Sequence, residues 1–170
     1  GKERLRSMIE TRPDWCVSRQ RVWGVPLPIF VNKKTKEILA DDEVNENIAN
    51  IYEKEGSDCW FSDNPQRFLG EKYKSEDYEK LSDIVEVWFD NGSTHSFVLE
   101  KREDLKWPAS MYLEGSDQHR GWFHSSLLES CGTRGKAPFE SILSHGFVVD
   151  GKGLKMSKSL GNVIAPEDIL

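Results

Sequence analysis

The sequence predicts a mixed α/β fold whose regular α/β part follows residue 82. Three observations support this: two short apolar runs at 111–113 and 142–149, a helix-like stretch at 118–131 between them, and a glycine-rich loop directly after the second run. This order, with polar loops beyond the strand ends, is typical of a doubly wound, Rossmann-like nucleotide-binding sheet. Ligands of such sheets lie at the carboxyl ends of the strands, where Glu114, Gly115 and the loop 151–161 would lie.

The residues before 82 have a different composition. Residues 12–30 are aromatic and basic and end in an extended Pro-x-Pro stretch, whereas residues 31–81 are mostly polar. We expect a hairpin turn at 32–35 and an amphipathic helix at 41–55. Its expected cap is Asp41 or Asp42, and its apolar face holds Val44, Ile48, Ile51 and Tyr52. Residues 56–80 are polar and are expected to be irregular apart from Trp60-Phe61 and Phe68-Leu69. We expect 31–81 to form a small inserted α+β module.

The elements after residue 82 are predicted from apolar runs and their flanking turn residues. Residues 84–89 are strand-like, and the turn 115–117 precedes a helix at 118–131 that Gly132 would end. The run 142–149 predicts the next strand. At the end of the chain, Pro166 and two acidic residues indicate the first turn of a helix.

Composition excludes several classes of protein. The 170 residues are 37% hydrophobic and 31% charged, and no apolar run approaches the roughly 18 residues of a membrane span. The net charge of −6 argues against a protein that is basic overall, although a local patch could still grip RNA. Cys16, Cys59 and Cys131 fit neither a disulfide framework nor a zinc site, which indicates a reducing, cytoplasmic setting.

The most informative feature is the stretch from Gly153 to Asn162. It places Lys155 and Lys158 on a short loop, interleaves them with two serines, and flanks them with glycines. Such a loop can bend around a polyphosphate, because ammonium groups meet its charge while hydroxyl and backbone N–H groups fill the remaining acceptor sites. As residue types alone, the same stretch could be a solvated basic loop.

Four segments together point to one family. The letters Lys-Met-Ser-Lys-Ser at 155–159 match the ATP-binding signature of class I aminoacyl-tRNA synthetases. With SRQRVWG (18–24), VEVWFDNGSTHS (85–96), YLEGSDQHRGWF (112–123) and HGFVVDGKGLKMSKSLGN (145–162), the whole chain resembles the bacterial-type isoleucyl-tRNA synthetases. Each segment also has a structural interpretation: the tryptophans could be core residues, the carboxylates helix caps, and His95, His119 and His124 hydrogen-bonding groups.

The resemblance implies a role for individual residues. It implies that Glu114 contacts the isoleucyl-adenylate and that a turn holds the ribose and nearby polar groups through Gly115, Asp117 and Gln118. It makes Trp88 and Trp122 two walls of the isoleucine pocket, as stiff indoles suit a site that measures a branched alkyl group. His145 and Gly146 would contact adenine. In the signature, Lys158 would stabilise the departing pyrophosphate, Lys155 would assist, and the ATP-binding set would be completed by Met156, Ser157 and Ser159.

The resemblance also implies the reaction, the partners and the layout. Isoleucine and ATP, accompanied by Mg²⁺, would give isoleucyl-adenylate, and the acyl group would pass to tRNA(Ile). Residues 1–30 would return to the catalytic domain, 31–81 would be inserted, and 82–170 would form the second half of that domain. The family's His-x-Gly-His type motif is not in these residues, so we expect this segment to need the remainder of the same synthetase chain and to be inactive alone. A stand-alone module that binds adenylate or an RNA end without catalysis is the alternative.

Two residues depart from the family's pattern. Asn91 stands where Ser is expected, and Leu154 stands where Arg or Lys commonly precedes the lysine loop. The second change removes a positive charge beside the expected phosphate site.

Overall fold

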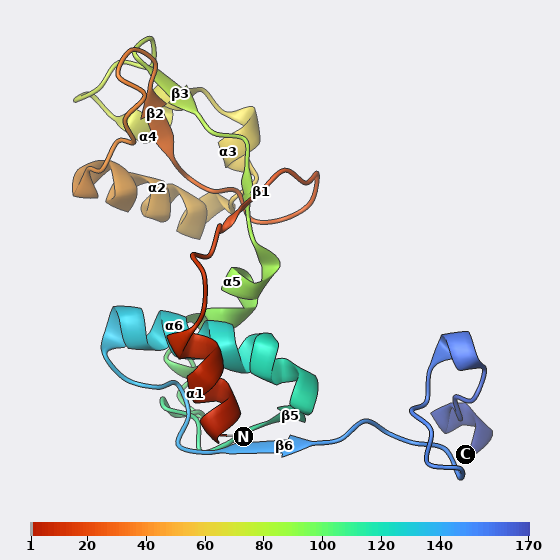
Figure 1. Ribbon diagram of the computed structural model, residues 1–170. Helices are drawn as coiled ribbons and strands as arrows, with labels where there is room; N and C mark the ends of the chain where they lie inside the picture. Colours follow the sequence, from red (N-terminus) through yellow and green to blue (C-terminus); the bar gives the residue numbers. More distant parts are fainter. Residues whose placement is uncertain (1) are drawn as a thin grey trace. The chain divides into compact units, whose positions relative to one another are not determined.

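The computed structural model describes residues 2–170, which divide into two compact units. Unit 1 comprises residues 2–13 together with Asn91–Leu170, and unit 2 comprises Asp14–Asp90. Figure 1 follows the chain through both. Among the described residues, no helix is both long and apolar enough to cross a membrane.

Unit 2 consists of two small antiparallel sheets and three helices. Its strands are β1 (Ser18–Arg19), β2 (Phe30–Asn32), β3 (Tyr78–Lys80) and β4 (Ile84–Val85), and its helices are α2 (Asp42–Glu55), α3 (Cys59–Ser62) and α4 (Pro65–Leu69). Strand β1 pairs with β4, and β2 pairs with β3. The hairpin turn expected after Asn32 is present, because Val31 bridges to Ile38 and the Asn32 side chain accepts from the N–H groups of residues 34 and 35.

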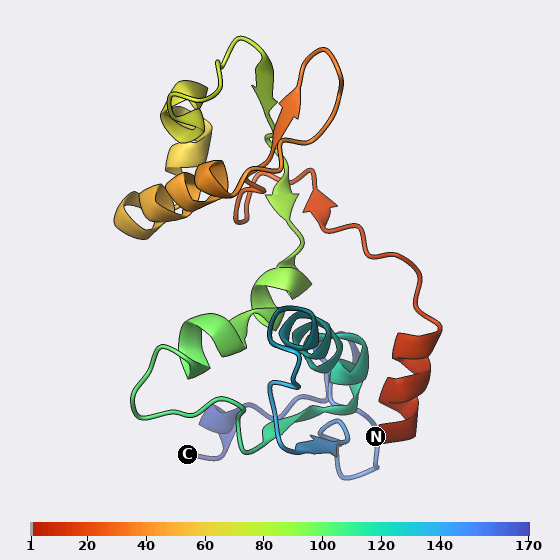
Figure 2. The same cartoon turned by 90° about the vertical axis from the view of Figure 1, so that its left-hand side faces the viewer.

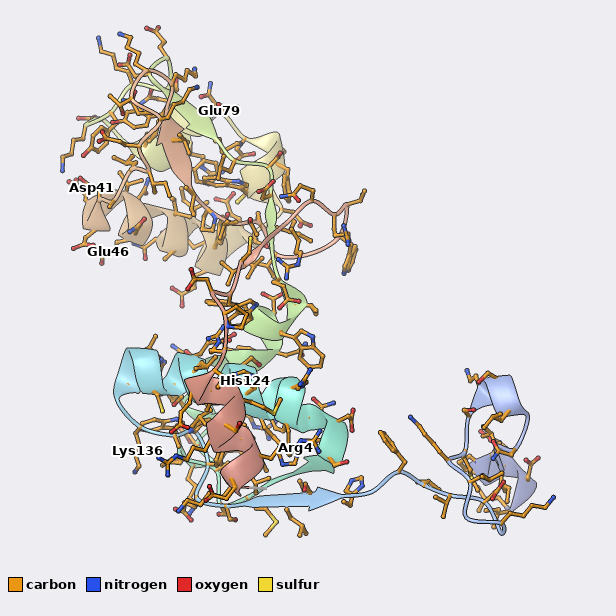
Figure 3. The ribbon with its side chains drawn as sticks, in the orientation of Figure 1. Arg4, Asp41, Glu46, Glu79, His124 and Lys136 are labelled. Atoms are coloured by element: carbon orange, nitrogen blue, oxygen red, sulfur yellow. The ribbon has the colours of Figure 1, made fainter. Side chains whose placement is uncertain are left out.

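The predicted helix of unit 2 is confirmed. The carboxylate of Asp41 accepts from the backbone N–H groups of Glu43 (3.0 Å) and Val44 (3.2 Å) and so caps α2, at whose start Figure 3 labels it. The buried face of α2 holds Val44, Ile48 and Ile51, as the spacing of apolar residues predicts.

The prediction that 56–80 is irregular apart from Trp60-Phe61 and Phe68-Leu69 is wrong in part, because those two pairs lie in helices longer than themselves and a strand follows. This stretch contains α3, α4 and β3, and it supplies the centre of the core through Trp60 and Phe68, both fully buried. The Trp60 ring lies 5.1 Å from Phe30 and 4.9 Å from Phe68 between centroids, and its indole N–H donates to the Leu81 carbonyl at 2.7 Å. A few large aromatic rings order a polar stretch because each buries much apolar area.

Unit 1 contains the predicted strand–helix–strand unit. Strand β5 (Tyr112–Gly115) and strand β6 (Ile142–His145) are parallel, and α6 (Trp122–Arg134) connects them. Figure 2 shows both strands beside α6. Tyr112 is buried toward the helix, whereas Leu113 and its partner Leu143 are more than half exposed on the other face. Helix α1 (Lys2–Glu10) contacts the turn that precedes α6.

The strand expected at 84–89 is mostly a helix. Strand β4 ends at Val85, and α5 (Val87–Gly92) begins after Glu86. The Glu86 carboxylate accepts from the backbone N–H of Trp88 at 3.1 Å and turns the chain. A short apolar run does not distinguish a strand from one helical turn, and here the acidic side chain decides.

Two further boundaries differ from the predictions. A 3₁₀ turn (Ser116–Arg120) precedes α6, and the helix continues through Gly132 to Arg134. Gly135, at φ 66°, ends it, with its N–H donating to the Cys131 carbonyl. Strand β6 ends at His145 rather than at 149, because Val149 turns back to bridge Lys155. At the end of the chain, the expected helical start is a 3₁₀ turn (Pro166–Asp168).

Candidate nucleotide-binding site

The carboxyl ends of β5 and β6 bring together four of the predicted site residues. The parallel register places Gly115 opposite His145, next to the exposed carboxylate of Glu114. A Cβ atom on Gly115 would lie 2.5 Å from Oδ1 of Asp117 and 3.9 Å from Cε1 of His145. The Asp117 carboxylate therefore packs directly over the glycine, and a side chain at position 115 would require Asp117 to move.

Gln118 links this turn to the start of α6. Its Nε2 donates to Oδ2 of Asp117 at 3.2 Å, and its Oε1 accepts from the backbone N–H of Trp122 at 3.0 Å. The amide of Gln118, and not a carboxylate, thus satisfies the N–H of the first residue of α6. That leaves the Asp117 carboxylate facing the strand end.

Two contacts fix the Trp122 side chain: one face of its indole ring stacks on another ring, and its ring N–H donates a hydrogen bond. Its indole stacks on Tyr112 with centroids 4.0 Å apart and planes 7° apart, and its Nε1 donates to the Asn91 carbonyl at 3.0 Å. Burial raises the pKa of the Tyr112 phenol. Trp88 lies on α5 in unit 2 and is 39% exposed, so a pocket shared with Trp122 stays a prediction.

Two of the three histidines, His119 and His95, have the hydrogen-bonding roles expected of them, whereas the buried Nε2 of His124 has no hydrogen-bond partner among the described residues. The Nδ1 atom of His119 lies 2.7 Å from the Ser116 carbonyl, and that of His95 lies 3.0 Å from the Gly92 carbonyl. Burial lowers the pKa of His95 and of His124, which favours neutral imidazoles. Within residues 2–170, no group of three His, Cys, Asp or Glu side chains is placed to hold a metal.

The lysine loop begins as a tight hairpin. Asp150 N–H donates to the Leu154 carbonyl (2.8 Å), and Met156 N–H donates to the Val148 carbonyl (2.9 Å). The Lys155 ammonium lies 3.6 Å from the centroid of the Phe147 ring, a cation–π contact.

The second half of the signature is a 3₁₀ turn. Ser157 precedes it, and its hydroxyl accepts from the N–H of Leu160 at 3.3 Å and lies 3.2 Å from the hydroxyl of Ser159. Lys155 and Lys158 are both exposed, so their ammonium groups are accessible to an anionic ligand.

Two side chains outside the predicted site residues organise this loop. The Asp150 carboxylate accepts from the N–H groups of Lys152 and Leu154 through Oδ1, and from Nδ2 of Asn162 through Oδ2, each at 2.9 Å. The Asn162 side chain also accepts from Ser157 N–H at 3.0 Å. The hydrogen bond from Asn162, followed by that from Leu154, lowers the pKa of Asp150. An Asp directly before Gly-Lys-Gly is the signal that could have predicted this side-chain turn.

A hollow of about 420 Å³ lies against the loop and is lined by residues at both of its ends: Asp150, Gly151, Lys152, Leu154, Leu160 and Asn162.

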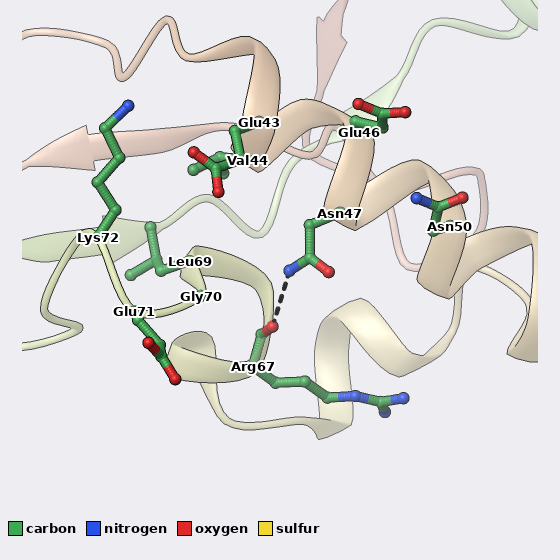
Figure 4. A pocket seen from close by; sticks show the side chains of 10 residues that line it. All are labelled: Glu43, Val44, Glu46, Asn47, Asn50, Arg67, Leu69, Gly70, Glu71 and Lys72. Carbon is green, nitrogen blue, oxygen red and sulfur yellow. Dashed lines mark hydrogen bonds between the residues drawn. The ribbon is translucent and has the colours of Figure 1, made fainter.

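Unit 2 has two further hollows. One of about 440 Å³ lies between α2 and α4 (Figure 4), where both lining cations are already paired, Arg67 with Glu55 and Asp63, and Lys72 with Asp41. The other, of about 810 Å³, is lined partly by Arg19, Arg21 and Trp23.

The two arginines that line the second hollow differ in their contacts. The Arg19 guanidinium donates to the carbonyls of Cys16 (2.6 Å) and Ser18 (2.8 Å) and so braces its own segment. Arg21 is exposed, and its guanidinium donates to the Gln20 carbonyl at 3.2 Å.

Comparison with known proteins identifies the family of the chain. A family model described as tRNA synthetases class I (I, L, M and V) matches residues 1–170. The chain is 88% identical to the isoleucine–tRNA ligase of Pelagibacter ubique over 170 residues, which are all of this chain and 19% of that protein. It is 60% identical to the isoleucine–tRNA ligase of Brucella suis over 171 residues, all of this chain and 17% of that protein. The chain thus spans about a fifth of the length of these relatives.

A solved structure shares the fold. The LeuRS of Agrobacterium radiobacter, crystallised as a ternary complex with tRNA and LeuAMS, superposes with a TM-score of 0.58. The match covers 91% of this chain and 22% of that one, at 24% sequence identity.

Proposed function

Because this chain belongs to the class I tRNA synthetases, the family of the isoleucine, leucine, methionine and valine enzymes, we propose that it is part of an isoleucine–tRNA ligase. The observation that carries the proposal is the 88% identity with the Pelagibacter ubique ligase over every residue of the chain. Leucine and valine enzymes belong to the same family, so this identity, rather than the fold, supports isoleucine as the substrate.

The proposed reaction has two steps. The carboxylate of isoleucine attacks the α-phosphorus of ATP, the bond to the bridging oxygen breaks, and pyrophosphate leaves with that oxygen. The terminal ribose hydroxyl of tRNA(Ile) then attacks the acyl carbon, and AMP leaves. Neither step forms a covalent bond to the protein, so the protein positions the reactants and stabilises charge.

The strand ends support the adenylate part of the proposal. Glu114 and Asp117 present carboxylates beside His145, where they can accept from ribose hydroxyls or from the ammonium of isoleucine. Gln118 fixes the turn that carries Asp117, and Gly146 leaves room for adenine. Trp122 presents an indole whose plane is set by Tyr112, and we assign the second wall of the isoleucine pocket to Trp88.

The lysine loop supports the pyrophosphate part. Lys155 and Lys158 are exposed on one short loop, with Met156, Ser157 and Ser159 alongside, and can neutralise charge that develops on the leaving group. Mg²⁺ would arrive with ATP on its phosphates, which is how magnesium usually reaches such sites.

The layout and setting of the chain also belong to the proposal. We assign 82–170 to the second half of a Rossmann-like catalytic domain, 31–81 to an insertion, and 1–30 to the segment that returns to the domain. The parallel β5–α6–β6 unit supports the first assignment. We also assign the chain to the cytoplasm, because Cys16, Cys59 and Cys131 follow no disulfide pattern.

A chimera tests the function. The corresponding segment of the Pelagibacter ubique ligase is replaced by residues 1–170, and exchange of pyrophosphate into ATP is measured with isoleucine, valine and leucine in turn. We expect isoleucine to be preferred and the Lys158→Ala variant to lose most of the exchange at unchanged folding. A folded chimera that does not respond to isoleucine, or that prefers another amino acid, would overturn the proposal.

The segment by itself distinguishes the proposal from a non-catalytic module. We expect no pyrophosphate exchange from residues 1–170 alone, because no His-x-Gly-His type motif is among them. Measurable exchange would contradict this expectation. Tight binding of a non-hydrolysable isoleucyl-adenylate by the segment, together with a native start codon near residue 1, would favour the module.

A further inference from the structure

We propose that Asp150 and Asn162 are positioning residues that hold the lysine loop in its phosphate-binding shape. We call this pair the Asp150–Asn162 latch. The inference rests on the proposed function, because it assigns how the loop of that site is prepared for ATP.

The latch joins the two ends of the loop. Asp150 and Asn162 are 12 positions apart, and the amide of Asn162 donates to the carboxylate of Asp150 at 2.9 Å. The carboxylate also holds the N–H groups of Lys152 and Leu154, each at 2.9 Å. A loop closed at its base has fewer conformations to lose when a ligand binds.

The same pair holds the backbone on both sides of Met156. Oδ1 of Asn162 accepts from Ser157 N–H at 3.0 Å, and its Nδ2 donates to the Lys155 carbonyl at 3.2 Å. The latch therefore fixes the backbone of Lys155 at its own carbonyl, and it fixes the backbone before Lys158 at the N–H of Ser157. Each lysine side chain then needs to order only its own rotamers on binding.

The residue types also fit this role. Asp150 is the only acidic residue between 146 and 164, a stretch that contains three lysines. A carboxylate repels a polyphosphate unless its charge is compensated. Here both oxygens are engaged by N–H donors, and the side chain is partly buried. Asn162 must both donate and accept, which a carboxylate cannot do.

A residue swap separates positioning from other effects. In Asp150→Asn/Asn162→Asp, the new Asn accepts from Lys152 and Leu154 and donates to the new Asp, which accepts from Ser157; only the donor to the Lys155 carbonyl is lost. The single change Asn162→Asp instead places two carboxylates together and breaks the latch. The swap therefore restores the closure without restoring the original charge position.

The experiment uses the folded chimera described above and measures pyrophosphate exchange against ATP and against isoleucine. For Asp150→Ala and Asn162→Asp, we expect kcat/KM for ATP to fall roughly 10- to 100-fold, while KM for isoleucine changes less than about twofold. The swap should recover most of that loss. The control is Asp104→Asn, which removes an exposed pair with Arg102 and should change neither parameter.

Hydrogen exchange gives a readout that does not depend on catalysis. The amides of Lys152, Leu154 and Ser157 should exchange faster in Asp150→Ala and in Asn162→Asp and should regain protection in the swap. A chimera without isoleucine activity would refute the proposed function alone, and this exchange pattern would then decide the latch. Unchanged ATP kinetics and unchanged amide protection in the single variants, or a swap no better than Asn162→Asp, would overturn the inference.

Discussion

Trp60 is the residue whose removal should cost unit 2 the most. Its side chain is fully buried and packs against the rings of Phe30 and Phe68. Its indole N–H donates to the Leu81 carbonyl. Replacing a buried Trp by Ala costs about 3–5 kcal/mol, and leaving the carbonyl without its donor adds about 1 kcal/mol. A unit of this size has a total stability of about 4–12 kcal/mol. Trp60→Ala should therefore remove a third or more of that stability.

The assay is urea unfolding, followed by circular dichroism and by hydrogen exchange of the α2 amides. Trp60→Phe keeps a ring in the core and should cost about 1–3 kcal/mol, less than the Ala variant. Phe61→Ala is the matched control, because Phe61 lies next to Trp60 on α3 but is 50% exposed. This variant should change the free energy of unfolding by less than about 1 kcal/mol. Equal unfolding midpoints for Trp60→Ala and Phe61→Ala would refute the assignment of the core.

Three further predictions concern the caps and the site. The hydrogen bond from Lys72 lowers the pKa of Asp41 from 3.8 to about 2. The stabilisation by its charge is therefore fully present above about pH 4 and is lost as the pH falls through about 2. The melting temperature should fall across that range, and it should fall less in Asp41→Asn. Gly115→Ala should displace Asp117 and raise KM for ATP in the exchange assay, since the new Cβ would lie 2.5 Å from its Oδ1. Tyr112→Ala should free the Trp122 indole and reduce the preference for isoleucine over valine, measured as the ratio of kcat/KM values.

Each of these has a control within the chain. Gly132→Ala adds a methyl group that no atom beyond its own helix backbone and chain neighbours approaches within 4 Å, so KM for ATP should not change. A rise equal to that of Gly115→Ala would contradict the steric argument. Tyr112→Phe keeps the stacked ring and should keep the isoleucine preference, and a loss as large as that of Tyr112→Ala would show that stacking is not the cause. A melting temperature of Asp41→Asn that follows the same pH dependence as the parent would show that Asp41 is not the titrating group.

The sequence was informative wherever the determinant is local. The helix 42–55 follows from a capping Asp41 and from apolar residues at a helical period, and both lie within one stretch of chain. The parallel strands β5 and β6 follow from two apolar runs separated by a helix, and the lysine loop from five consecutive letters. These signals depend on neighbours within a few residues, so the chain alone contains them.

Tertiary structure decided the features that depend on partners distant in sequence. Strand β4 stops at Val85, where it is paired with Ser18, and the Glu86 side chain then starts a helix. The stretch 56–80 is ordered because Trp60 meets Phe30 across the unit. The orientation of Trp122 is set by Tyr112 and Asn91, and the latch joins residues at opposite ends of a loop. The free energy of such contacts depends on which surfaces pack together in the fold. Neither composition nor periodicity contains information on that packing.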